Sequence, residues 1–152
     1  MIDSPAVKIL PPFVPIIIMA LGAVAHQIFP LEIGSSIMIP VIGSLLVVLS
    51  IPIVGAALKE ILGAETAFDV RKPSTTLVTS GIFQYSRNLT YLSMIILCFG
   101  ISFIANSWLL IFAAALAGSG LCVLVIRQEE SYLQQKFGQR YHAYCSAVRR
   151  WI

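Results

Sequence analysis

Four stretches of the chain contain no Asp, Glu, Lys or Arg, and each is long enough, or nearly so, to cross a hydrocarbon core of about 30 Å. They cover residues 12–29, 36–58, 89–105 and 108–126. Hydrophobic residues make up 58% of the chain and charged residues only 11%, which excludes an ordinary soluble domain. The sequence therefore predicts an all-α integral membrane bundle of about four spans.

All ten Lys and Arg residues fall on one side of this four-span arrangement. The N-terminus carries one, the segment 59–88 carries four and the tail after residue 126 carries five, whereas the two opposite connections carry none. Basic residues beside spans are retained in the cytoplasm, so both termini are expected there. The net charge of +3 suits topology signals and lipid headgroup contacts, and we expect no nucleic-acid partner.

The N-terminus has a competing interpretation. Lys8, the apolar run that follows it and the triplet Ala23–Val24–Ala25 resemble a cleavable signal peptide. Apolar character continues to Phe29, which favours a membrane span instead. The chain lacks a basic, serine-rich transit segment, and together with its compact size this favours a prokaryotic inner membrane. The three cysteines, two of them within spans, do not form a disulfide framework.

Composition divides a single predicted membrane domain, residues 1–152, into four parts. These are an N-terminal helical hairpin (12–58), a cytosolic loop (59–88), a second helical hairpin (89–126) and a cytosolic amphipathic tail (127–152). The second hairpin turns tightly at Asn106–Ser107, so its two helices are expected to be antiparallel and in contact. A loop as long as 59–88 without a clear helix is typical of a functional segment.

The tail carries apolar and aromatic residues at intervals of three or four, which is the spacing of one helix face. They are Leu133, Phe137, Tyr141, Tyr144, Val148 and Trp151. Two interpretations remain open from this pattern. The helix lies on the inner leaflet with its aromatic rings at headgroup depth, or it folds over the central loop as a lid.

Charged residues meet where the second hairpin enters and leaves the membrane. Arg87 precedes one helix, and Glu129 and Glu130 follow its antiparallel neighbour, so they lie at the same membrane level. Unpaired charge is costly at this depth, and a pocket with both signs of charge would suit a zwitterionic ligand. Simpler roles exist for each residue, such as a snorkelling Arg87, a helix-capping Asn88 and solvated acids. We expect no metal site, since no cluster has metal-ligand spacing, and we expect His26 to be packed rather than catalytic.

Two sequence blocks carry a resemblance to a known family. The block LVTSGIFQYSRNLTY (77–91) is followed, after one hairpin, by EESYLQQKFGQRYHAY (129–144). Together they resemble the signature blocks of the isoprenylcysteine carboxyl methyltransferase and phospholipid methyltransferase family of integral membrane methyltransferases. The resemblance implies S-adenosylmethionine as cofactor, bound beneath the amphipathic tail. It implies methyl transfer at the cytosolic face to a lipophilic acceptor, either the carboxylate of a prenylated thiol compound or the amine of a lipid.

The resemblance also implies roles for individual residues. Arg87 and Glu130 are the expected catalytic residues, and Arg127 is the expected substrate contact. The expected cofactor-binding residues are Thr75, Thr76, Leu77, Val78, Gly81, Phe83, Asn88, Leu89, Thr90, Tyr91 and Glu129.

Two positions depart from the family pattern. Leu89 stands where the family's turn has proline, which restores an N–H and frees φ. Val125 stands where the isoprenylcysteine enzymes have a substrate-binding arginine, and Arg127 lies two residues further on. A degenerate membrane scaffold of the same fold is therefore one alternative. A small four-span transporter is another, although His26 is its only ionisable residue with a side chain suited to coupling within a span.

Overall fold

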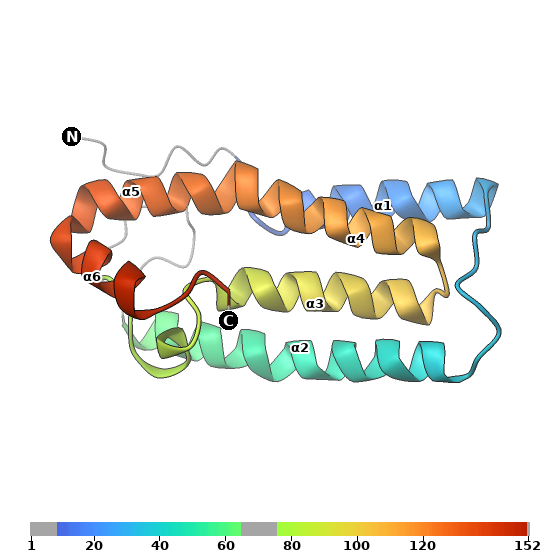
Figure 1. Cartoon of the computed structure of the whole chain (residues 1–152), viewed down its shortest axis with the longest axis horizontal. Coiled ribbons are helices and arrows are strands. Elements are labelled where there is room, and N and C mark those ends of the chain that lie inside the picture. The colour runs from blue at the N-terminus through green and yellow to red at the C-terminus, as the bar shows by residue number, and fades with distance from the viewer. Residues whose placement is uncertain (1–8, 65–75, 152) are drawn as a thin grey trace.

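The computed structural model describes residues 9–64 and 76–151, and all regular structure in these ranges is helical (Figure 1). The elements are α1 (Phe13–Ile28), α2 (Met38–Gly63), a short 3₁₀ helix η1 (Gly81–Gln84), α3 (Leu89–Ile104), α4 (Trp108–Leu121), a π-helical turn η2 (Cys122–Ile126), α5 (Arg127–Phe137) and α6 (Gln139–Ala147). The predicted all-α class is confirmed.

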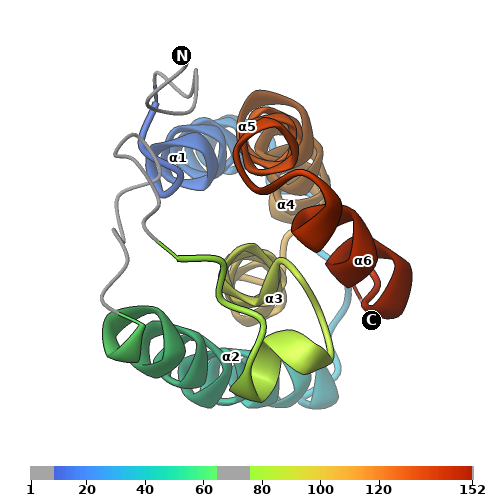
Figure 2. The same cartoon turned by 90° about the vertical axis from the view of Figure 1, so that its left-hand side faces the viewer.

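Helix α3 lies at the centre of the bundle, and α2 and α4 both pack along it (Figure 2). Helix α1 packs along α4, so α1 and α2 follow one another in the chain but lie against different helices. The predicted contact between the antiparallel helices α3 and α4 is confirmed.

Small residues bring these helices close together. A Cβ on Gly22 of α1 would lie 2.7 Å from the Cβ of Ala113 in α4, and a Cβ on Gly43 of α2 would lie 2.7 Å from the carbonyl oxygen of Gly100 in α3. Side chains at either glycine would force the backbones apart. The α1–α4 and α2–α3 interfaces therefore depend on close backbone approach, as is usual for helices packed within a membrane.

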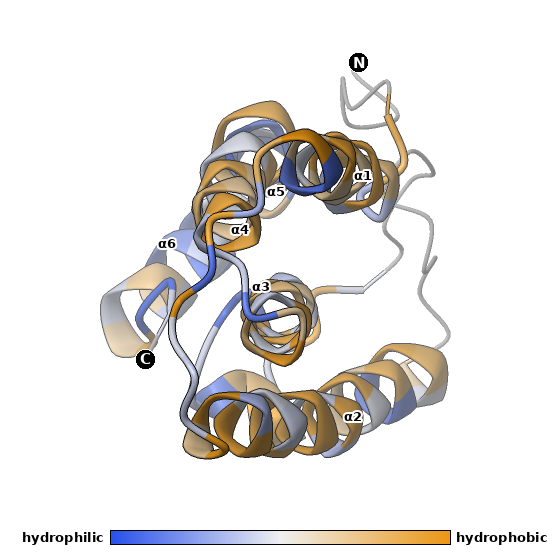
Figure 3. Cartoon of the chain, turned by 90° about the vertical axis from the view of Figure 1, so that its right-hand side faces the viewer, coloured by the Kyte–Doolittle hydropathy of each residue, from blue (hydrophilic) through white to orange (hydrophobic). Residues whose placement is uncertain are grey.

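Most residues of helices α1 to α4 are apolar, as the hydropathy colouring of the ribbon shows (Figure 3). Helix α2 and the continuous helix from Trp108 to Phe137 are long and apolar enough to cross a membrane, and α1 and α3 are shorter apolar helices. Large side chains such as Leu21, Leu45 and Phe112 are more than half exposed. Contiguous apolar surface of this extent is typical of a lipid-facing protein, and it supports a location in the membrane.

The end of the bundle at residues 29–37 and 105–107 is closed by polar contacts. Asn106, which has a φ of +51°, donates from Nδ2 to the Gly34 carbonyl oxygen (2.8 Å) and accepts from the Gly34 amide (3.2 Å). The Ser107 hydroxyl lies 3.0 Å from His26 Nδ1 and accepts from the Leu110 amide, capping α4. His26 is thus held in a hydrogen bond at the end opposite the predicted pocket.

The tail differs from the single amphipathic helix that its periodicity predicts. The last span does not end at residue 126, because it continues through the π-helical turn η2 into α5 as far as Phe137. Gly138, with a φ of +53°, ends α5, and α6 turns back beside the 81–88 segment (Figure 1). The apolar stripe is therefore divided between two helices and the non-helical residues 148–151, which we name the C-terminal strap. Helix α2 likewise extends five residues into the predicted loop.

Candidate functional site

Residues 76–88, which lead to the site and which we name the approach segment, are anchored on α2. Gly81 opens η1 with a φ of +56°, and a Cβ at this position would overlap the carboxylate of Glu60. Ser80 donates its hydroxyl to the same carboxylate at 2.8 Å. Phe83 is buried in an apolar cluster with Ala57 of α2. Glycine is required here by the close approach to α2, and this is a structural reason for its presence.

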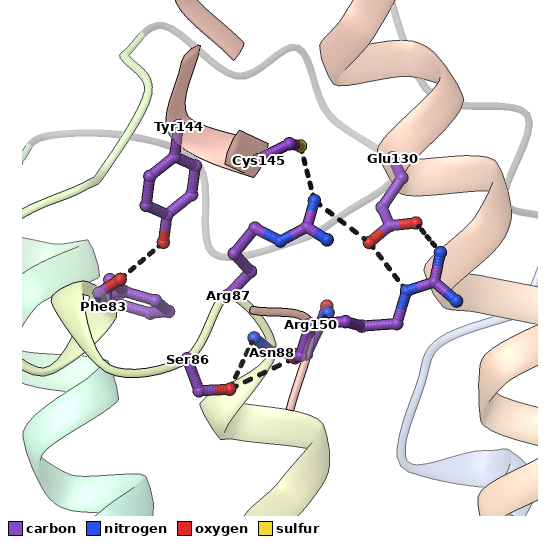
Figure 4. Close-up of polar contacts among 8 residues, drawn as sticks. All are labelled: Phe83, Ser86, Arg87, Asn88, Glu130, Tyr144, Cys145 and Arg150. Carbon is purple, nitrogen blue, oxygen red and sulfur yellow. Dashed lines mark hydrogen bonds and ion pairs between the residues drawn. The ribbon is translucent and has the colours of Figure 1, made fainter. Parts of the chain in front are cut away.

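The turn at residues 86–88 is bound by the strap, mainly through backbone carbonyl groups (Figure 4). The Arg87 amide donates to the Arg149 carbonyl oxygen at 3.1 Å. The Ser86 hydroxyl and Asn88 Nδ2 both donate to the Arg150 carbonyl oxygen, each at 3.2 Å. Asn88 stands at the N-cap position of α3, but its side chain makes no capping bond to the helix. Its side-chain amide instead binds the C-terminal strap.

Three charged side chains form a cluster above this turn (Figure 4). Arg150 binds the Glu130 carboxylate with two hydrogen bonds, from Nε at 3.1 Å and from an Nη atom at 2.6 Å. Arg87 lies 3.6 Å from the same carboxylate and donates to the sulfur of Cys145. The bond to Glu130 raises the pKa of the Arg150 guanidinium. The Nε atom of Arg87 is buried and has no hydrogen-bond partner among the described residues.

Glu129 has a different partner from the one its membrane level suggests. Its carboxylate accepts a 2.6 Å hydrogen bond from the Tyr91 hydroxyl on α3, whereas the acid next to Arg87 is Glu130. Tyr91 belongs to an apolar cluster that includes Val125 and Trp151 of the strap. The Glu129 carboxylate and the Tyr91 hydroxyl thus lie beside the charged cluster, next to apolar side chains that limit the access of water.

Helix α6 covers the approach segment. The Tyr144 hydroxyl donates to the Phe83 carbonyl oxygen at 2.6 Å. Burial raises the pKa of Tyr144 to about 12, although the nearby Arg87 guanidinium opposes this rise. Burial, together with the Glu130 charge, raises the pKa of Tyr141 above its ordinary value. These contacts favour the lid interpretation of the tail over a helix that lies on the leaflet alone.

Among the described residues, the other predicted site residues make no direct contact with the charged cluster that the structure records, and they differ in how far they are buried. Thr75 lies outside the described residues, and Thr76 is exposed. Val78 packs against the apolar cluster that holds Phe83 and Leu89, while Leu77 and Thr90 are half-buried. Arg127 is exposed, and no ion pair joins it to another residue in ranges 9–64 and 76–151.

Several residues of the site carried no clear signal in the sequence. The Ser86 hydroxyl donates to the Arg150 carbonyl oxygen, and the Cys145 sulfur accepts from Arg87. Arg149 contacts the turn through its backbone carbonyl group, whereas Arg150 also binds Glu130 through its guanidinium. Every residue has a backbone carbonyl group, so such contacts leave no signal in the sequence. The basic and aromatic residues 149–151 are the sequence feature that could have indicated a contact between this segment and the acids. Within the described part of the chain, no group of three or more His, Cys, Asp or Glu residues could hold a metal ion.

Comparison with known proteins gives one family. A family model described as phospholipid methyltransferase matches residues 38–140, which cover more than half of the chain. The comparisons with curated proteins and with solved structures gave no significant match.

Proposed function

Because the chain belongs to the phospholipid methyltransferase family, we propose that it transfers a methyl group from S-adenosylmethionine to a lipophilic acceptor at the cytosolic face of the membrane. Family membership indicates a membrane methyltransferase with a lipid-type substrate. Family membership does not identify the cofactor, the membrane face or the acceptor, and we propose these in addition. The observation that carries it is the meeting of Arg87, Glu129 and Glu130 at one end of an otherwise apolar bundle.

The side chains at this end suit the proposed cofactor. S-adenosylmethionine carries an ammonium group and a carboxylate on its amino-acid part and supplies an electrophilic methyl group on its sulfonium. Arg87 Nε is a buried donor with no partner among the described residues, which suits a carboxylate. Gln128 Oε1 is a buried acceptor without a partner in the same part of the chain, and an acceptor of this kind suits an ammonium. Buried polar groups of this kind are rare unless a ligand or water completes them.

The chain's own contribution to such a reaction is mainly positioning and exclusion of water. Tyr91 orients Glu129 through its short hydrogen bond, and the cluster around Val125 and Trp151 keeps that bond dry. Glu130 is held by Arg150 and Arg87 and has no free oxygen in this arrangement. A carboxylate acceptor would require no base. An amine acceptor would require Glu130 to be released before it could remove a proton.

Two observations bear on the rival functions. Leu89 is buried against Phe83 and Ala57, so its apolar contact replaces the rigidity that proline would give the turn, which favours an enzyme over a degenerate scaffold. His26 is bonded to Ser107 at the far end of the bundle and is remote from the charged cluster, which disfavours a coupled transporter.

The proposal is tested by reconstituting the purified protein in vesicles and supplying cofactor with a labelled methyl group. We expect label in the lipid fraction, with loss of at least about tenfold in Arg87→Gln because positioning supplies much of the rate. Glu32→Gln, at the opposite end of the bundle, is the matched control and should retain the wild-type rate. Absence of label with phospholipid amines and with prenylated thiol acids, from folded protein that binds the cofactor, would instead favour a scaffold.

A further inference from the structure

One face of α3 is exposed, although this helix lies at the centre of the bundle. Its exposed residues are Leu97, Ile101 and Ile104, with exposed fractions of 37%, 43% and 47%. Their spacing of four and three residues places them on one side of the helix. The half-buried residues Met94 and Thr90 continue this side toward the start of α3. We name these five residues the open face of α3.

The open face lies between α1 and α2. On one flank α3 packs closely on α2, where a Cβ on Gly100 would lie 2.8 Å from the side chain of Val47. On the other flank Tyr91 belongs to the same apolar cluster as Val14 of α1. On a helix of 3.6 residues per turn, the open face falls between these two flanks. Helices α1 and α2 lie on opposite sides of α3 (Figure 2), so the open face meets the hydrocarbon of the bilayer.

The open face leads to the charged cluster. Thr90 stands in the first turn of α3, directly before Tyr91, whose hydroxyl binds Glu129. A helix rises about 1.5 Å per residue, so Ile101 lies about 16 Å from Thr90 along the axis. One leaflet contributes about 15 Å of hydrocarbon, which is half of the roughly 30 Å core. A lipid in the leaflet at this end therefore has its headgroup at the level of the charged cluster and its chain alongside the open face.

From this continuity we infer that the open face of α3 binds a hydrocarbon chain of the lipid acceptor and directs its polar group to the charged cluster from within the leaflet. Lipid tails are as apolar as leucine, so transfer of a chain from the bilayer to this face gains little hydrophobic free energy. The gain is positional, because a chain held along Leu97 and Ile101 places the acceptor beside Arg87, and positioning supplies much of the rate of such a transfer. The identity of the bound lipid as the acceptor rests on the proposed function, whereas the presence of a chain site does not.

Methyl transfer in vesicles with increasing mole fractions of phosphatidylethanolamine tests the contribution of the open face. Leu97→Trp fills this face with a larger ring, so the KM for the lipid should rise about tenfold while the Kd for the cofactor stays unchanged. Ile101→Trp, one turn further along, should have the same effect. Leu116→Trp is the matched control and should leave the KM unchanged, because Leu116 of α4 is 61% exposed and lies as far from the turn at Asn106–Ser107 as Leu97 does.

A second readout does not depend on methyl transfer. Phosphatidylethanolamine with a diazirine in the middle of one chain is included in phosphatidylcholine vesicles, and the photolabelled peptides are identified by mass spectrometry. We expect labelling within residues 94–104 that excess unlabelled phosphatidylethanolamine suppresses and that Leu97→Trp reduces about tenfold. Ordinary contact with the bilayer would label α4 around Leu116 to the same extent and would not saturate.

The outcomes separate the chain site from the proposed function. Labelling that does not saturate, or that is equal in the wild type and Leu97→Trp, would overturn the chain site. A dimer that Leu97→Trp dissociates would also overturn it, since a second copy would then cover the open face. Methyl transfer with a wild-type KM in both tryptophan variants of α3 would overturn the chain site and leave the proposed function standing. Saturable labelling of α3 in a protein that binds no cofactor would support the chain site and refute the proposed function.

Discussion

Substitution of Gly81 by alanine tests how the approach segment is anchored on α2. The φ of +56° costs an L-residue about 1–2 kcal/mol. The new Cβ would overlap the Glu60 carboxylate, of which even the farther oxygen lies only 2.8 Å away. A carboxylate is the mobile end of a flexible side chain, so Glu60 can swing aside, but it then loses its bond to Ser80 at a cost of about 1 kcal/mol. The expected destabilisation is about 2–3 kcal/mol.

The two contributions can be separated with Glu60→Ala as the second background. There the overlap and the Ser80 bond are already absent, so Gly81→Ala should cost only the conformational part, about 1–2 kcal/mol, which leaves a coupling of about 1 kcal/mol. Thermal unfolding in detergent measures this, since 1 kcal/mol corresponds to about 2–4 °C for a chain of this size. Equal shifts of melting temperature in both backgrounds would show that the Glu60 contact contributes nothing. No shift in either would refute the left-handed backbone at Gly81.

Three further outcomes are expected. Leu89→Pro should lower stability by about 1–2 kcal/mol through lost burial, while the first position of α3 accepts proline without losing a helix hydrogen bond; a complete failure to fold would contradict this. Asn106→Ala removes two hydrogen bonds to Gly34 and a favoured left-handed residue, so the melting temperature should fall by several degrees while methyl transfer by folded protein persists. Burial raises the pKa of Tyr144 to about 12 from an ordinary value of 10.0. The contribution of the protonated Tyr144 hydroxyl to the free energy of unfolding is therefore fully present below pH 10 and is lost as pH rises from 10 to 12. Thermal stability in that window should fall more in the wild type than in Tyr144→Phe, which cannot ionise or bond to Phe83.

The membrane spans could be predicted because apolar runs determine them directly. The predicted starts at Leu89 and Trp108 are the starts of α3 and α4. Apolarity does not determine where a helix ends, however, and the last span continues into polar sequence because nothing before Gly138 interrupts it. The antiparallel hairpin was also sufficient to predict that Arg87 lies at the same membrane level as Glu129 and Glu130.

The pairing within the site could not be predicted in the same way. The π-helical turn at Cys122–Ile126 inserts extra residues per turn and rotates the following helix relative to an α-helical count. That rotation decides that Glu130 faces Arg87 while Glu129 faces Tyr91. The strap was equally hidden, because most of its bonds to the turn accept at backbone carbonyl groups, which have no signature in side-chain pattern. The roles of the individual site residues remain predictions.

The central claim is that the charged end of the bundle binds S-adenosylmethionine, and calorimetry on the detergent-purified protein tests it most directly. We expect the wild type and the distant control Glu32→Gln to bind the cofactor with equal affinity. We expect Arg87→Gln and Glu129→Gln to bind it at least about tenfold more weakly, because each loses a buried charged partner. Equal binding by all four proteins, or no binding by folded wild type at millimolar cofactor, would contradict it.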